Sequence, residues 1–187
     1  MLLNIYLISH PIIKILSNSI TYLNNNQTIN EYNYKYLGLF LIYEIMRKHI
    51  SLKSIYINKI SYIKEISILD SNIEYYIITN LLNTHYIIGD IKILIPNINI
   101  INITNNIESM NDQIKEQINY LNKNKKIIIL DNILDQSWTM ILISNLINEL
   151  NINTNSINIA CLACYNQILD NIGQKYPQLN IYTTKII

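Results

Sequence analysis

The sequence predicts a single α/β domain whose core is a parallel β-sheet. From about residue 72 onwards, short apolar runs alternate with amphipathic stretches, which is the pattern of parallel strands joined by crossover helices. The chain has 187 residues, which is about the length of one domain and enough to bury a core without a disulfide or metal staple. We therefore expect residues 1–187 to form one domain.

The segments before this alternation predict two helices and a small flap. Residues 10–23 and 29–49 each place apolar side chains three and four positions apart, as an amphipathic helix does. Residues 50–69 alternate weakly and predict a hairpin or flap. The apolar start of the chain has no basic region or cleavage site and contains Pro11, so we expect no signal peptide.

The core elements follow in chain order. Five apolar runs have the length of buried strands, at residues 73–79, 98–104, 126–130, 157–163 and 179–183. The stretches between them have helical spacing, at residues 85–94, 107–121, 137–150 and 165–176. The asparagine-rich connections are only a few residues long, so we interpret them as loops inside the domain.

Charge and composition exclude several classes of protein. The net charge is +1 and 14% of the residues are charged, whereas a protein that binds nucleic acid shows a basic stripe and a high pI. The longest uncharged runs contain asparagine at almost every second or third position, which is costly in a bilayer. We expect neither a nucleic-acid partner nor a membrane span.

Cys161 and Cys164 spell a CxxC motif that invites a redox or zinc interpretation. A zinc site needs four ligands, and the three histidines are scattered without ligand spacing. A redox CxxC begins a helix, whereas Cys161 lies within a predicted strand. We expect buried strand residues and no metal site, and we expect His85 to be a capping or core residue rather than a general base.

The most informative segment is the apolar run at residues 126–130 with the turn that follows it. Asp131 comes at the end of a predicted central strand, and open α/β sheets bind ligands at that edge. Asp131 is thus a candidate to hold ribose hydroxyls, and a helix starting near Ser137 would direct its free N–H groups at an anion. The alternative is that Asp131 only ends a strand and Ser137 only caps a helix.

Short motifs in order along the chain resemble the uracil phosphoribosyltransferase family. HPIIK at residues 10–14 resembles the family's His-Pro-Leu-Val-Lys start. LIYEIMR at residues 41–47 resembles its Leu-Leu-x-Tyr-Glu-Ala-x-Arg helix, and KYPQLNIYTTKI at residues 175–186 resembles its closing strand. Each motif is weak alone, but their order and near-gapless spacing make the resemblance specific.

The resemblance implies a fold and a reaction. The family has the type I phosphoribosyltransferase fold, a parallel sheet flanked by helices with a small hood, and is usually dimeric. It makes UMP and pyrophosphate from uracil and phosphoribosyl pyrophosphate in pyrimidine salvage. No cofactor is bound by protein side chains, and Mg²⁺ enters with phosphoribosyl pyrophosphate. A homodimer is therefore the implied assembly.

The family's phosphate loop, Asp-Pro-Met-Leu-Ala-Thr-Gly-Gly-Ser/Thr, corresponds to residues 131–139 here. Asp131, Asp135, Ser137 and Thr139 are the candidate remnant of that loop. Its two glycines are replaced by Ser137 and Trp138, and the carboxylate of Asp135 would repel a phosphate. These changes predict weak binding or none of phosphoribosyl pyrophosphate or another phosphate ligand.

Other parts of the family's site also differ. The Ile-Leu-Arg-Ala-Gly turn that grips pyrophosphate corresponds to residues 81–85, where Asn83 replaces the arginine. The Tyr-Arg-Asn-Glu segment has no counterpart near Asn105, because Arg47 is the chain's only arginine. The family's glycine-rich uracil loop has no counterpart before Ile187.

These departures predict a homologue of the family with little or no activity. Two alternatives stay open: a non-catalytic structural or partner-binding module on the same scaffold, and an enzyme of altered specificity that holds a smaller phosphate with Asp131, Ser137 and Thr139. Isoleucine and asparagine dominate the composition and valine is absent, which indicates AT-rich codons. With no targeting peptide, this bias predicts a plastid-encoded protein of the chloroplast stroma, or else a cytoplasmic one.

Overall fold

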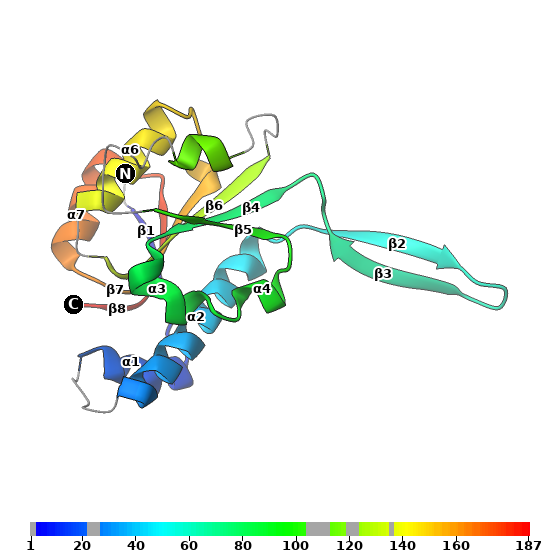
Figure 1. Cartoon of the computed structure of the whole chain (residues 1–187), viewed down its shortest axis with the longest axis horizontal. Helices are drawn as coiled ribbons and strands as arrows, with labels where there is room; N and C mark the ends of the chain where they lie inside the picture. Colours follow the sequence, from blue (N-terminus) through cyan, green and yellow to red (C-terminus); the bar gives the residue numbers. More distant parts are fainter. Residues whose placement is uncertain (1–2, 22–26, 104–112, 119–123, 135–136) are drawn as a thin grey trace.

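The computed structural model shows a three-layer α/β/α arrangement with a long hairpin extending from one side (Figure 1). It describes residues 3–21, 27–103, 113–118, 124–134 and 137–187. The strands are β1 (Asn4–Leu7), β2 (Leu52–Asn58), β3 (Ile63–Leu69), β4 (Glu74–Thr79), β5 (Ile98–Asn102), β6 (Lys125–Leu134), β7 (Ile157–Cys164) and β8 (Asn180–Ile186). The helices are α1 (Pro11–Thr21), α2 (Gln27–His49), α3 (Leu81–Ile88), α4 (Ile91–Leu94), α6 (Ser137–Asn148) and α7 (Asn166–Lys175), with a 3₁₀ turn at Thr154–Ser156 and a further helical stretch at residues 113–117.

The central sheet is parallel, as the alternation of apolar runs and helices predicts. Its strand order is β1-β8-β7-β6-β4-β5, and β2 and β3 form a separate antiparallel pair. All eight residues of β7 are buried, because helices cover both faces of the sheet around it. Such strands read as continuous apolar runs rather than alternating ones.

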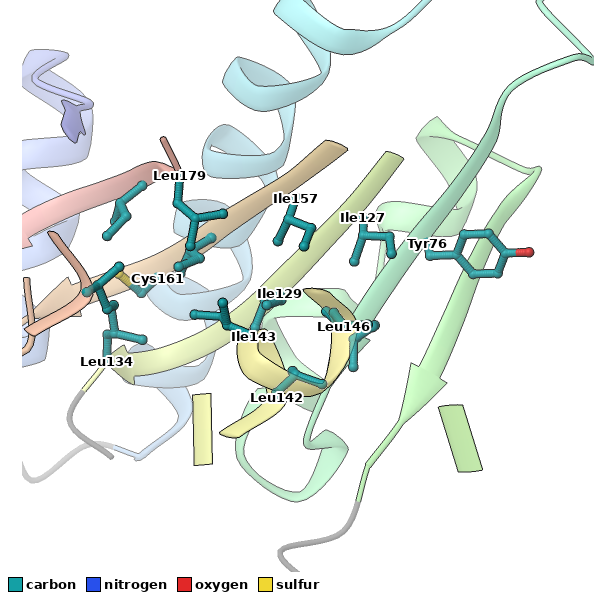
Figure 2. Close-up of a cluster of buried hydrophobic side chains, with 14 of the residues drawn as sticks. Tyr76, Ile127, Ile129, Leu134, Leu142, Ile143, Leu146, Ile157, Cys161 and Leu179 are labelled. Carbon is teal, nitrogen blue, oxygen red and sulfur yellow. The ribbon is translucent and has the colours of Figure 1, made fainter. Parts of the chain in front are cut away.

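Two apolar cores lie on the two faces of the sheet. On one face, Ile129 of β6 and Cys161 of β7 pack against Leu142, Ile143 and Leu146 of α6 (Figure 2). On the other face, Ile128 and Leu130 pack with buried residues of α2 and α3. Since successive side chains of a strand point to opposite faces, β6 contributes to both cores at once.

Several predicted boundaries are wrong. The strand predicted at residues 126–130 continues to Leu134, and the helix predicted at residues 85–94 is instead two helices, α3 and α4, that begin at Leu81 and Ile91. The sequence also gave no indication of β1, because all four of its residues are exposed and carry no burial pattern. β1 becomes a strand only through its pairing with β8. Part of the helix predicted at residues 107–121 lies outside the described residues.

Gly38 allows α2 and α3 to lie in close contact. A Cβ atom at this position would lie 2.7 Å from the carbonyl oxygen of Ile87 and would also overlap its Cγ2. The backbone of α3 cannot move away by itself, because α3 packs into the same core as α2. A glycine in the middle of a helix costs about 1 kcal/mol relative to alanine, so this close packing offsets a local penalty.

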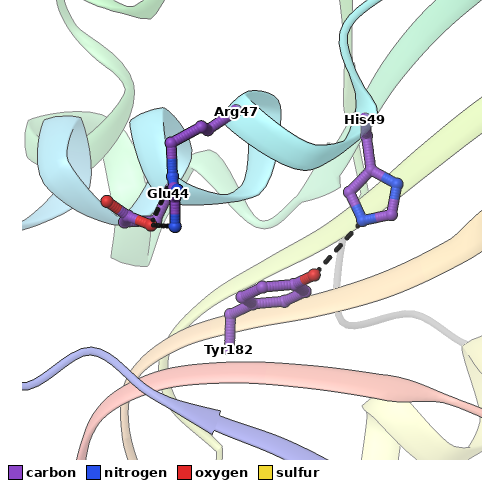
Figure 3. Close-up of polar contacts among 4 residues, drawn as sticks. All are labelled: Glu44, Arg47, His49 and Tyr182. Carbon is purple, nitrogen blue, oxygen red and sulfur yellow. Dashed lines mark hydrogen bonds and ion pairs between the residues drawn. The ribbon is translucent and has the colours of Figure 1, made fainter.

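The end of α2 is fixed to the sheet by hydrogen bonds near β4 and β8. The hydroxyl of Tyr75, in β4, donates to the carbonyl of His49 (3.3 Å) and accepts from the N–H of Ser51 (3.0 Å). The His49 ring lies 3.2 Å, Nε2 to Oη, from Tyr182 of β8 (Figure 3). Burial, reinforced by the charges of Lys126 and Lys48, lowers the pKa of His49 below its ordinary value of 6.5.

This lowered pKa predicts a loss of stability in mild acid. The unfolded chain takes up the proton at a higher pH than the folded chain, so the free energy of unfolding falls as the pH drops from about 6.5 through the lower folded pKa. Urea unfolding at several pH values will show this slope in the wild type and a shallower slope in His49→Gln. His85→Gln, at an exposed position, serves as the control and keeps the wild-type slope; equal slopes in all three proteins would contradict the assignment.

Candidate functional site

The topology places a candidate site between β4 and β6. From β4 the chain passes to β5 on one side, and it then returns to β6 on the other side of β4. The helices that follow accordingly lie on opposite faces, with α3 in one core and α6 in the other. Open α/β sheets bind ligands at the carboxyl ends of the two strands at such a switch point. The two turns to consider are therefore those that follow β4 and β6.

The turn after β4 uses its own backbone donors. Asn80 caps α3: its side chain accepts from the N–H of Leu82 (3.0 Å), and its carbonyl accepts from those of Asn83 (3.1 Å) and Thr84 (3.2 Å). The remaining N–H, that of Leu81, donates to the side chain of Asn102 in β5 (3.0 Å). The donors that a helix N-terminus offers to an anion are thus already bonded within the chain.

Two threonine hydroxyls close the space beneath this turn. Thr79 Oγ1, at the end of β4, donates to the carbonyl of Leu130 in β6 (2.7 Å) and lies 2.7 Å from Thr84 Oγ1. Thr84 Oγ1 also lies 2.8 Å from the carbonyl oxygen of Asn80. Both threonines are fully buried, so this network ties β4, β6 and α3 together.

Asp131 lies inside β6 and not at its end. The strand runs three residues further, and Asp131 is level with Cys161 of β7 and only 5% exposed. Its Oδ1 accepts from the N–H of Asn132 (2.8 Å). The prediction that Asp131 comes at the carboxyl end of a strand is therefore wrong by a few residues, and the carboxylate is covered in this structure.

The other predicted loop residues occupy the start of α6 or precede it. Ser137 is the first residue of α6, which confirms the predicted beginning of this helix. Thr139 is fully buried, and its Oγ1 has no hydrogen-bond partner among the described residues. Asp135 lies outside the described residues, and so does Asn105. Asp131 and Thr139 are thus both buried, and both lie near the same edge of the sheet.

The cysteine motif is part of the core. Cys161 and Cys164 are buried, free thiols in β7, as the sequence predicted. The neighbouring Cys164 sulfur, burial and the Asp131 carboxylate all raise the pKa of the Cys161 thiol. His85 is exposed in the last turn of α3 and does not cap it, so the prediction of a capping or core role is wrong. Within the described ranges, no group of three or more potential metal ligands comes together.

The chain's arginine lies away from this edge. Arg47 is in the last turn of α2, whose end contacts Tyr75 at the beginning of β4, and its Nε and Nη2 both donate to Glu44 Oε2 (3.1 and 2.9 Å; Figure 3). The segment from Asn80 to Gly89 contains no lysine or arginine. The turn after β4 thus offers an anion neither an unbonded backbone N–H between Leu81 and Thr84 nor a lysine or arginine of its own.

Sequence reasoning missed the residues that shape this turn. Asn80 precedes an apolar helical run, and asparagine is a preferred N-cap, so this signal was present in the sequence. Asn102 carried no such signal, because its contact with Leu81 depends on β5 lying beside β4. In the described part of the chain, no helix is long and apolar enough to cross a membrane.

The arrangement defines an α/β protein of the type I phosphoribosyltransferase-like fold. The solved structure of the AQ2163 protein from Aquifex aeolicus superposes on it with a TM-score of 0.74, covering 97% of this chain and 86% of that one at 19% identity. This similarity concerns the fold alone. No protein-family model matches the chain.

Two curated relatives identify the family to which this chain belongs. The uracil phosphoribosyltransferase homologue of Porphyra purpurea is 33% identical over 189 residues, and that of Pyropia yezoensis is 31% identical over 186 residues. Each alignment covers 100% of this chain and 89% of the relative. The chain therefore belongs to the family of uracil phosphoribosyltransferase homologues, as the motif order predicted.

The buried hydroxyl of Thr139 gives a test of the turn after β6. A buried polar group without a partner costs about 1–3 kcal/mol, so Thr139→Val is expected to raise the free energy of unfolding by about 1 kcal/mol in urea titrations. The matched control is Thr84→Val, which removes a buried hydroxyl that is hydrogen-bonded and should lower stability by a similar amount. Equal destabilisation by both changes would show that the Thr139 hydroxyl has a partner in solution.

Proposed function

We propose that this chain is a uracil phosphoribosyltransferase homologue that keeps the family's scaffold and has lost most or all of the transfer of phosphoribosyl groups to uracil. The observation that supports this most directly is the turn after β4. There the N–H groups of Leu81, Leu82, Asn83 and Thr84 all donate within the chain. The arginine that the family uses at this turn corresponds to Asn83.

The loss of binding free energy for phosphoribosyl pyrophosphate indicates how far the activity is reduced. A hydrogen bond to a charged group contributes about 1.5–3 kcal/mol, so the loss of roughly three phosphate contacts removes about 5–9 kcal/mol. This corresponds to a factor of about 10³ to 10⁶ in affinity. The burial of Asp131 adds to this deficit, because a covered carboxylate cannot reach ribose hydroxyls without movement of the turn.

Calorimetric titration with phosphoribosyl pyrophosphate and Mg²⁺, followed by an assay for UMP, tests this proposal. We expect no binding in the millimolar range by the wild type and no UMP above a blank without protein. Asn83→Arg returns a cation to the turn and should give measurable binding, since one charge-assisted hydrogen bond corresponds to a factor of about ten or more. It should still form no UMP.

Asn83→Gln is the matched control, because it lengthens the same side chain without adding charge. It is expected to behave as the wild type. Sub-millimolar binding of phosphoribosyl pyrophosphate by the wild type, or UMP formation that depends on uracil, would overturn the proposed loss of activity.

A second candidate function, a partner-binding module, is favoured by the β2–β3 hairpin. The two strands pair along their whole length and extend away from the sheet (Figure 1). The exposed apolar side chains of the two strands and their connecting turn are Leu52, Ile55, Tyr56, Ile57, Ile60, Tyr62, Ile63 and Ile68. An isolated two-stranded ribbon is marginally stable, and contiguous exposed apolar surface marks an interaction site. We propose that the hairpin is covered in a homodimer.

Sedimentation velocity tests this assembly. The wild type should sediment as a dimer at micromolar concentration, whereas the double variant Ile57→Glu, Ile63→Glu should be monomeric because each carboxylate would be buried without a partner. Ile93→Glu changes another exposed isoleucine, in α4, and should remain dimeric. A monomeric wild type, or a double variant that stays dimeric, would refute the role of the hairpin.

A further inference from the structure

β1 leaves one edge of the central sheet open. In the described part of the chain it pairs only with β8. The N–H of Ile8 donates to the carbonyl of Thr183 (2.9 Å), and alternate residues of a parallel strand bond to the same neighbour. The backbone groups of Tyr6 therefore face β8, while those of Ile5 and Leu7 face outward. An edge of this kind can accept another strand.

A groove lies on each face of this edge. The two grooves have volumes of about 550 Å³ each, and Ile5 contributes to both. The groove on the α2 face, here the basic groove, is lined in part by Tyr6, His10, Glu44, Arg47, Lys48 and Tyr182. The groove on the α7 face, here the apolar groove, is lined by Leu3, Ile5, Leu169, Asp170, Gly173, Gln174 and Pro177. An added strand would send successive side chains into the two grooves in turn.

The basic groove presents two cations beside stacked aromatic rings. Tyr6 stacks on Tyr182 with ring centroids 4.7 Å apart, and Lys48 Nζ lies 3.6 Å from the Tyr6 centroid. None of the ion pairs between described residues includes Lys48. Arg47 shares Glu44 through Nε and Nη2 and is 60% exposed, so it keeps further N–H donors for a second carboxylate.

The apolar groove has a different chemistry. Leu3, Ile5, Leu169 and Pro177 are its apolar members, Gln174 is polar, and Asp170 is its charged member. Gly173 leaves α7 close to the strand, because a Cβ there would already lie 3.4 Å from that of Leu3. This groove suits short aliphatic side chains and not acidic ones.

We propose that the open edge of β1 binds an extended peptide segment of a partner, with acidic side chains in the basic groove and aliphatic side chains in the apolar groove. The open N–H and C=O groups of Ile5 and Leu7 would supply main-chain hydrogen bonds, and the grooves would supply the choice of sequence. A second copy of this chain fits less well. Antiparallel pairing of two β1 strands about a two-fold axis keeps both basic grooves on the same face, where their cations repel.

Fluorescence anisotropy with labelled synthetic peptides of about ten residues, the upper length of ordinary strands, tests this proposal on the full chain. The probe alternates glutamate with valine. One control peptide replaces each glutamate by lysine, and another carries N-methyl groups on alternate residues, which remove main-chain donors while keeping the side chains. We expect the glutamate peptide to bind at least about tenfold more tightly than either control.

Protein variants test separately how the charge of Lys48 and the open strand edge contribute to peptide binding. Lys48→Glu is expected to weaken binding of the glutamate peptide by about tenfold or more. Lys92→Glu makes the same charge change in α4, near the opposite edge of the sheet, and should leave this binding unchanged. Ile5→Pro removes an outward N–H and is acceptable at an edge strand. Because this variant could fail to fold, amide exchange by NMR on the wild type provides a second measurement.

Binding should slow the exchange of the Ile5 and Leu7 amides selectively, since the amides of Tyr6 and Ile8 already face β8. Three outcomes would overturn the proposal: equal binding of the glutamate and lysine peptides, no binding of the glutamate peptide, or binding that leaves the Ile5 and Leu7 amides unprotected. A dimer of the wild type that Lys48→Glu strengthens would assign this edge to a second copy of the chain instead.

Discussion

The burial of both faces of the parallel sheet is the constraint on which the rest of the structure depends. Central strands β6 and β7 are covered by α6 and α7 on one face and by α2 and α3 on the other. A sheet covered in this way sends some connections over one face and some over the other, and the order of β5, β4 and β6 creates a switch point between them. The place of the candidate site follows from this topology whether or not the site still binds its ligand.

At that switch point, the chain's own polar groups bond to the backbone donors at the start of α3. Asn80 and Asn102 take up the backbone donors at the start of α3, and Thr79 and Thr84 close the space below. Each contact is locally stabilising, because buried or capped donors that lack a partner are costly. These contacts tie β4, β5, β6 and α3 together, so the same polar groups that bond to the donors at the start of α3 also stabilise the scaffold.

The hairpin and β1 both combine exposed apolar side chains with an unpaired strand edge in the described part of the chain. The β2–β3 hairpin is a ribbon with no third strand, and β1 has a neighbour on one side only. The short length of β1 and the basic residues beside it limit unspecific pairing at the open edge.

The sequence by itself determined the class of fold, the five buried strands of the core from β4 to β8 and the beginning of α6, because long apolar runs and helical spacing are local signals of burial. It also determined that Cys161 and Cys164 are core residues. Only the tertiary structure decided that β6 extends past Asp131 and buries it, that Asn102 bonds to the start of α3, and that the exposed residues of β1 form a strand. These features depend on pairing and hydrogen bonds between segments far apart in the sequence, such as β1 with β8 and Asn102 with Leu81, and a local pattern cannot record such contacts.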